Sequence, residues 1–147
     1  MIPEAAVFQL ADEAALRAYA MIRPQHLESE LPPLFDMPGA DRPTPLRQVL
    51  AHAAYDEAWI PDLLAGRTMD EAGRDAYDGD LLGDDAYGNL ARICERAREA
   101  AAAVTDREAV VHCAFGDVPA WGYFWQLNIA RSLAAHDIAL HLARNRR

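Results

Sequence analysis

Four stretches of the chain repeat apolar residues at the three- and four-residue spacing of an amphipathic helix, and segments rich in proline, glycine or aspartate separate them. This pattern constrains the fold most, because apolar side chains at that spacing form one stripe that has to be buried. None of the intervening segments has the alternation of a convincing strand pair. The sequence therefore predicts an all-α protein, a four-helix bundle formed by a single domain over residues 1–147.

Proline and glycine indicate where the first two helices begin and end. The first helix is expected over residues 3–23, because Pro24 cannot continue it. Its expected apolar stripe comprises Val7, Leu10, Ala14, Ala18 and Met21. The second helix is expected to begin near Thr44, a good N-cap, and to end at Gly66. The proline-rich connector between these helices carries no strand pattern.

The second half of the chain predicts a long connection followed by two further helices. Residues 67–83 are acidic and contain several glycines, which is typical of a loop, with one helical turn near residues 69–73. The third helix is expected to begin at Asp84 or Asp85, since an acid suits the positive end of a helix. Residues 110–115 are expected to form an extended linker with a turn at residues 116–117, before a fourth helix over residues 119–143.

Composition excludes several classes of protein. The formal net charge is -9, which disfavours binding to nucleic acid and to anionic membranes, because both require positive charge. No apolar run is long enough for a transmembrane helix, and the N-terminal residues do not resemble a secretory signal. Cys94 and Cys113 form no paired motif, so both are expected to be free thiols. These features predict a cytoplasmic protein with a small-molecule or protein partner.

Five segments together resemble one known family. They are residues 43–52, 59–67, 115–120, 123–127 and 137–139, which occur in the order and spacing of the metal-binding domain of the mycothiol-dependent maleylpyruvate isomerase family. The resemblance covers nearly the whole chain. It implies a bundle of the DinB/YfiT-like type with a long connection between the second and third helices.

The resemblance also implies a site. Members of the family typically hold a divalent metal, such as zinc, between a histidine on the second helix and two ligands four residues apart on the last helix. Residues at that spacing share one face of a helix, so both can reach one ion. With mycothiol as cofactor, such a metal would favour the thiolate that adds to the substrate. His52 matches the position of the first ligand.

The two ligand positions on the last helix depart from the family pattern. They fall on Ala130 and Ala134, and alanine cannot ligate a metal. Asp137 and His141 form an acid–histidine pair further along that helix and are a less favoured alternative. The sequence therefore predicts a degenerate metal site, with His52 as the remaining candidate ligand.

Three functions stay open at this point. The first is a bundle with a degenerate metal site. In it, His52 and Asp56, one helical turn apart, could perform acid–base chemistry without a metal, or the cavity left by Ala130 and Ala134 could bind a small molecule near Trp59 and Trp125. The second function is an active thiol transferase or isomerase that uses both metal and mycothiol. The third is a non-catalytic homodimeric interaction module, with interface residues such as Trp121 and His136.

Overall fold

The computed structural model describes residues 1–32 and 43–145. Within these ranges the protein is mostly helical, with two small antiparallel sheets. The helices and strands are α1 (Pro3–Ala20), a 3-10 turn (Pro24–His26), β1 (Glu30–Leu31), β2 (Thr44–Pro45), α2 (Leu46–Leu64), α3 (Met69–Ala72), α4 (Ala86–Ala102), β3 (Val110–Cys113), β4 (Gly116–Pro119) and α5 (Ala120–Arg144).

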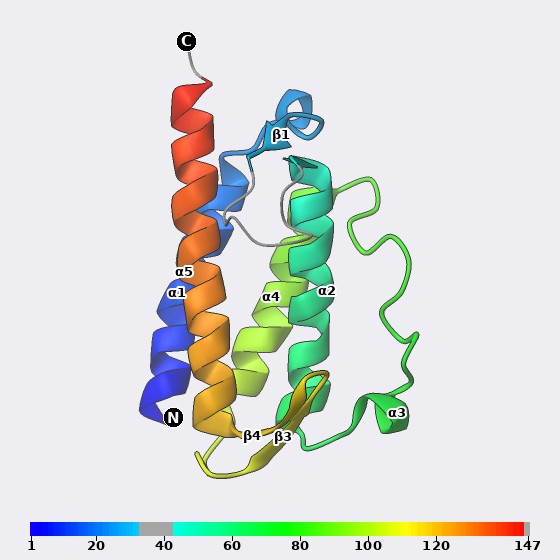
Figure 1. The fold of residues 1–147 in the computed structure, drawn as a ribbon, viewed down its shortest axis with the longest axis vertical. Helices are drawn as coiled ribbons and strands as arrows, with labels where there is room; N and C mark the ends of the chain where they lie inside the picture. Colours follow the sequence, from blue (N-terminus) through cyan, green and yellow to red (C-terminus); the bar gives the residue numbers. More distant parts are fainter. Residues whose placement is uncertain (33–42, 146–147) are drawn as a thin grey trace.

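The four long helices lie side by side (Figure 1). α1 packs mainly against α5 and also against α4, and α2 packs against α4. α1 and α5 run in one direction, whereas α2 and α4 run in the other. Because α2 and α4 are parallel, the chain has to return along the whole molecule between them. The predicted long connection, which includes the short helix α3, makes this return.

The helix ends follow the expected signals to within a few residues. α1 ends at Ala20 rather than at residue 23, and Pro24 opens the 3-10 turn that follows. α2 begins at Leu46 rather than near Thr44, because Thr44 belongs to β2. Asp85 caps α4 as expected, and its carboxylate accepts a hydrogen bond from the backbone N–H of Gly88 at 3.1 Å. Gly66 follows α2 with a φ of 81°.

Two pairs of short strands correct the expectation that the connectors contain none. β1 pairs with β2, so the ends of the proline-rich connector meet, while residues 33–42 between them lie outside the described residues. β3 pairs with β4, and Val111 lies opposite Val118. The predicted turn at residues 116–117 is wrong, because these residues begin β4. The missed signal is the β-branched pair Val110 and Val111, which favours a strand.

The buried face of α1 also differs from the predicted stripe. Of that stripe only Ala18 is buried, and Val7, Leu10 and Met21 are exposed. The face that packs inward carries apolar residues such as Phe8 and Tyr19 together with two acids. Glu4 and Asp12 interrupt the apolar pattern of this face, whose other buried residues recur at three- and four-residue spacing.

The core consists of two apolar clusters with a charged layer between them. One cluster contains Phe8, Ile60 and Phe124, toward the end of the molecule that holds the β3–β4 hairpin. The other contains Leu50 and Ile138, toward the opposite end. The charged layer contains Asp12 of α1, Glu57 of α2 and Arg131 of α5. Along each of these three helices, the charged residue lies between residues of the two apolar clusters.

None of the helices within residues 1–32 and 43–145 combines the length and the apolar character that crossing a bilayer requires.

Candidate functional site

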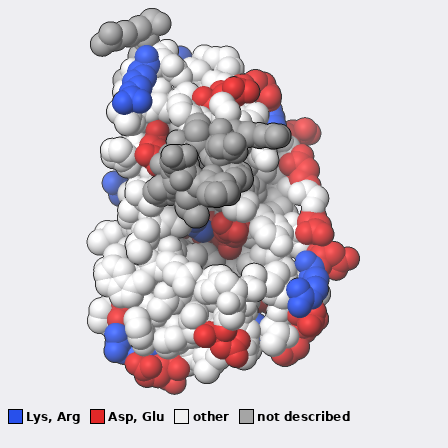
Figure 2. Space-filling view, in the orientation of Figure 1, with Lys and Arg blue, Asp and Glu red and all other residues white. Residues whose placement is uncertain are grey.

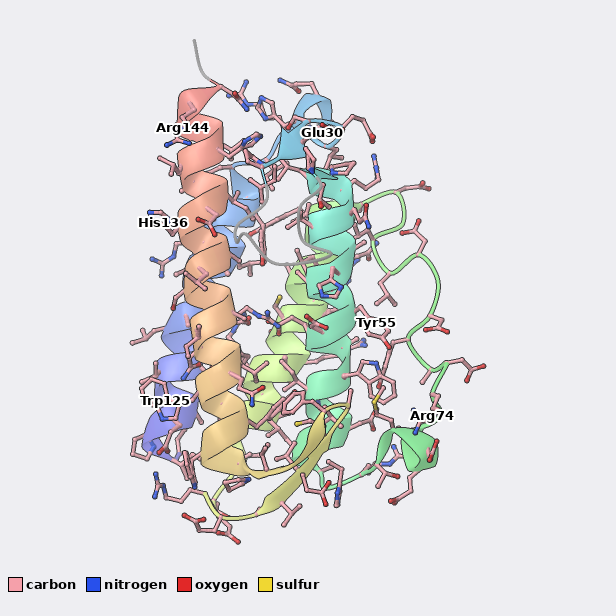
Figure 3. All side chains as sticks on the ribbon, in the orientation of Figure 1. Glu30, Tyr55, Arg74, Trp125, His136 and Arg144 are labelled. Carbon is pink, nitrogen blue, oxygen red and sulfur yellow. The ribbon has the colours of Figure 1, made fainter. Side chains whose placement is uncertain are left out.

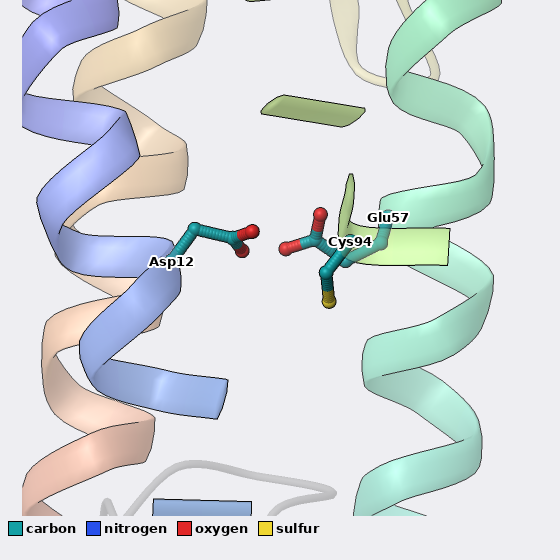
Figure 4. Close-up of side chains that lie close together, drawn as sticks. All are labelled: Asp12, Glu57 and Cys94. Atoms are coloured by element: carbon teal, nitrogen blue, oxygen red, sulfur yellow. The ribbon is translucent and has the colours of Figure 1, made fainter. Parts of the chain in front are cut away.

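Two carboxyl groups face each other in the charged layer. Asp12 and Glu57 are each almost fully buried, and Figure 4 shows their side chains pointing toward one another from α1 and α2. Cys94 of α4 lies beside them, and one ligand atom of each residue lies within 4.8 Å of the other two. Two buried acids at this separation repel each other unless cations or a shared proton neutralise them.

Two arginines supply the positive charge. The Nε–H of Arg131 donates to Oε1 of Glu57 at 2.6 Å, and the same nitrogen lies 3.6 Å from Oδ1 of Asp12. Nη1 of Arg98, on α4, donates to Oδ2 of Asp12 at 3.1 Å. Only 6% of the Arg131 side chain is exposed, so its ion pairs are screened little by solvent. The charged layer therefore links all four long helices.

Burial raises the pKa of Glu57 well above its usual range, and the adjacent Asp12 carboxyl group adds to the rise. The nearby charge of Arg131 opposes this shift without cancelling it. Removal of a carboxylate from water is the largest cause because the group has almost no contact with solvent. Burial and the neighbouring acid thus both favour the protonated form of Glu57.

Neither cysteine has the character of a reactive thiolate. Burial raises the pKa of Cys94 far above its usual range, and Glu57 and Asp12 raise it further. Burial also raises the pKa of Cys113 to about 11, with a smaller contribution from Asp117. Both side chains therefore remain neutral thiols at neutral pH, which disfavours nucleophilic or metal-bound roles for them.

A cavity of about 420 Å³ lies at the β1 end of the molecule, but a smaller cavity of about 340 Å³ reaches the charged layer. The smaller cavity lies between α2 and α5 and extends to the β3–β4 hairpin. Figure 2 shows a hollow on this face with acidic and basic atoms beside it. Its lining residues are mainly aromatic or apolar, and they are Tyr55, Asp56, Trp59, Leu63, Met69, Cys113, Ala114, Phe115, Tyr123, Gln126, Leu127, Ala130 and Arg131.

Two buried hydrogen-bond donors belong to residues that line this cavity. Nε1 of Trp59 and Nη2 of Arg131 have no hydrogen-bond partner among the described residues. The Trp59 ring is held by edge-to-face contacts with Tyr55 and Tyr77, at centroid distances of 6.4 and 4.9 Å. The cavity thus combines fixed aromatic walls with donors that lack an acceptor, which is typical of small-molecule sites.

The predicted acid–base pair lies near the cavity but on the outer surface. Nε2 of His52 is 3.4 Å from Oδ2 of Asp56, as the i, i+4 spacing predicts. The His52 side chain is 75% exposed and the Asp56 side chain 43% exposed. Asp56 lines the cavity, whereas His52 does not. The pair is thus a solvated feature of α2.

The other predicted ligand-binding residues are divided between the cavity and the surface. Trp59 and Ala130 line the cavity, so the structure brings together one candidate from each of α2 and α5. Trp125 is 49% exposed, and Figure 3 shows it on the side of α5 away from α2. Ala134 is partly buried but is not a lining residue.

Asp137 and His141 lie at the other end of α5. Oδ1 of Asp137 is 3.1 Å from Nδ1 of His136, and Nε2 of His141 is 3.0 Å from Nδ2 of Asn145 and 3.4 Å from Oγ of Ser29. Both residues line a separate hollow with Ser29 and Glu30. The structure does not bring either of them to His52.

The residues present do not fit the divalent metal that the family resemblance implies. Methyl groups stand at positions 130 and 134, and His52 points largely into solvent. Within the described part of the chain, the group of side chains close enough to hold an ion is Asp12, Glu57 and Cys94. Arg131 and Arg98 already neutralise the two acids, and the cysteine is a neutral thiol. A divalent ion would have to displace a guanidinium group.

Sequence reasoning missed the charged layer, although a signal for it exists. Asp12 lies in phase with Phe8 and Tyr19 on the buried face of α1, and Arg131 lies in phase with Phe124 and Ile138 on α5. Two acids and a base at core positions of three helices can all be buried only if their charges neutralise one another, so their side chains have to lie together. A search for compensating charges at core positions would have found these residues.

Comparisons of the chain with protein-family models, with curated proteins and with solved structures find no match.

Proposed function

We propose that the chain is a four-helix bundle of the DinB/YfiT-like type that binds a small, largely apolar molecule in the cavity between α2 and α5. The observation that carries this proposal is a cavity whose lining combines aromatic residues with Trp59 and Arg131, each of which has a buried donor without a hydrogen-bond partner among the described residues. The long connection between α2 and α4 also supports the bundle type. We further propose that the binding needs no metal, because a fixed guanidinium supplies the positive charge between the helices.

The loss of the family's ligand positions has a direct consequence for this cavity. Ala130 is one of the lining residues, and its methyl group leaves space where a metal ligand would stand. A volume of about 340 Å³ suits a molecule with one or two rings. His52 and Asp56 lie at the outer edge of the cavity, on the α2 side. They could exchange a proton with a bound molecule only if that molecule reached the surface.

Indole, a neutral aromatic probe, tests the proposed binding. Titration followed by calorimetry and by NMR should give a dissociation constant of about 1 mM or lower. Ala130→Phe should abolish the binding, because the ring fills the cavity. Ala143→Phe, the same change at another exposed position of α5 that does not line the cavity, should leave binding unchanged. Equal affinity of both variants for indole would refute the proposed site.

A second candidate function is a homodimer formed through α1 and α5. Eight large apolar side chains on these two neighbouring helices are exposed, and they are Val7, Leu10, Met21, Trp121, Trp125, Ile129, Leu133 and Leu140. Trp121, Trp125, Ile129 and Leu133 repeat at four-residue spacing, so they form one stripe along α5. A surface of this kind is typical of protein interfaces.

Sedimentation equilibrium tests the homodimer. The protein should associate to a dimer in the micromolar range, and Ile129→Glu should give a monomer, because the new charge lies within the stripe. Arg92→Glu, on an exposed position of α4, should leave the association unchanged. A wild-type protein that stays monomeric at all concentrations, or a dimer that survives Ile129→Glu, would contradict this candidate.

A further inference from the structure

The charges in the layer are unequally placed with respect to the cavity. Asp12 and Glu57 bear two carboxyl groups, and Arg98 and Arg131 bear two positive charges. Two arginines face two acids, so the layer carries no net negative charge. Arg98 is bonded to Asp12 on the α1–α4 side, whereas Arg131 lines the cavity. The guanidinium of Arg131 is therefore the cation of this layer that a ligand in the cavity would meet.

The hydrogen bonds of Arg131 leave its guanidinium incompletely satisfied. Nε donates to Glu57, but Nη2 has no acceptor among the residues that the structure describes. Nε1 of Trp59, another residue that lines the cavity, also lacks an acceptor within that part of the chain. A buried donor without an acceptor is energetically unfavourable, and more so when it is charged. A ligand that brings an anionic acceptor to this place would remove that cost.

The remaining lining residues define the rest of the ligand. Tyr55, Tyr123 and Leu127 present apolar surface, and Phe115 lies exposed at the hairpin end. Asp56 is the one acid among the lining residues, and it is paired with His52 at the outer edge. An acid at this edge disfavours an anion there, so the anionic group is directed inward to Arg131.

We propose that the ligand of this cavity is an amphipathic carboxylate, an aromatic or aliphatic body whose carboxylate inserts between α2 and α5 and accepts hydrogen bonds from Arg131 and Trp59. This inference rests on the proposed function, because it names the class of ligand for the same cavity. Arginine is suited to this role, since its planar guanidinium can hold Glu57 on one edge and a second carboxylate on another.

Phenylacetate and phenylacetamide test the inference, because they have the same shape and differ in charge. Calorimetric titration at neutral pH should show that phenylacetate binds at least about tenfold more tightly, as expected for hydrogen bonds to a charged group. Arg131→Gln should remove this preference. Arg17→Gln removes a charge from a side chain that is 80% exposed, and it should leave the preference intact.

The variants and ligands separate the possible outcomes. Trp59→Phe keeps an aromatic ring but removes the donor, so it should weaken phenylacetate binding more than phenylacetamide binding. This second variant tests the inference without a change at Arg131. Equal binding of the two compounds to the wild-type protein would overturn the inference and would leave the cavity as a neutral site, with water on the two donors. Failure of phenylacetate, phenylacetamide and indole alike would overturn the proposed function itself.

Discussion

Asp56 and Glu57 are consecutive residues of α2, yet their surroundings are opposite. The Asp56 carboxylate lies at the surface beside His52, where solvent competes with the pair. The Glu57 carboxyl group is buried, contacts Arg131 and faces Asp12. A rotation of about 100° between successive helical residues accounts for the difference. The comparison teaches that the same functional group can be a solvated surface feature or the centre of a core, according to helical phase alone.

The largest effect is expected when the buried cluster loses its central cation. Arg131→Met keeps an apolar side chain of similar length but leaves Asp12 and Glu57 facing each other with less neutralisation. The free energy of unfolding should fall by about 3–5 kcal/mol, which is typical when one partner of a buried ion pair is removed. Arg17→Met, at the exposed end of a surface pair, should change it by no more than about 0.5 kcal/mol. Urea denaturation measures both values. If the two variants lost similar amounts of unfolding free energy, Arg131 would not be the central cation of a buried cluster.

The second effect is a pH dependence that belongs to Glu57. Its pKa is higher in the folded protein than in the unfolded chain, so the folded protein keeps a proton that the unfolded chain releases. This contribution to stability is complete below the ordinary glutamate pKa of 4.5 and is lost as the pH rises through the higher pKa of the folded state. Glu57→Gln stays neutral at every pH.

The stability of the wild-type protein relative to Glu57→Gln should therefore fall with rising pH, by as much as about 1.4 kcal/mol per pH unit within that range. Urea denaturation of both proteins at a series of pH values gives the difference directly. A difference that rises with pH would mean that Glu57 is stabilised as a carboxylate by Arg131, contrary to the account given for the pair.

The smallest effect is expected at the surface pair. His52→Ala and Asp56→Asn should each change the free energy of unfolding by less than about 0.5 kcal/mol, because exposed ion pairs contribute little. The double variant should equal the sum of the two single variants within the error of the measurement. A coupling energy above about 1 kcal/mol would show that the pair is less solvated than its exposure indicates.

Helix positions were predictable because proline, glycine and aspartate limit helices locally. Pro24, Gly66 and Asp85 each lie within a few residues of an observed helix end. The β3–β4 hairpin was missed because its strands are short and stabilise each other only when paired, which a local pattern does not reveal.

The candidate site was predictable only in part. Trp59 and Ala130, expected as ligand-binding residues, both line the cavity between α2 and α5, whereas a role in ligand binding stays a prediction. Asp12 and Arg131 were missed because charged residues are normally assigned to the surface. Their burial depends on partners that are distant in sequence, so only a search for compensating charges at core positions of other helices could have predicted it.

The central claim is that Arg131 supplies the cation between the helices, in the place of a divalent metal. Calorimetric titration of the purified, chelator-treated protein with zinc tests it most directly. The account predicts no binding with a stoichiometry of one ion per chain at micromolar concentration. One zinc ion bound per chain, with a heat that disappears in a Glu57→Gln variant, would contradict it.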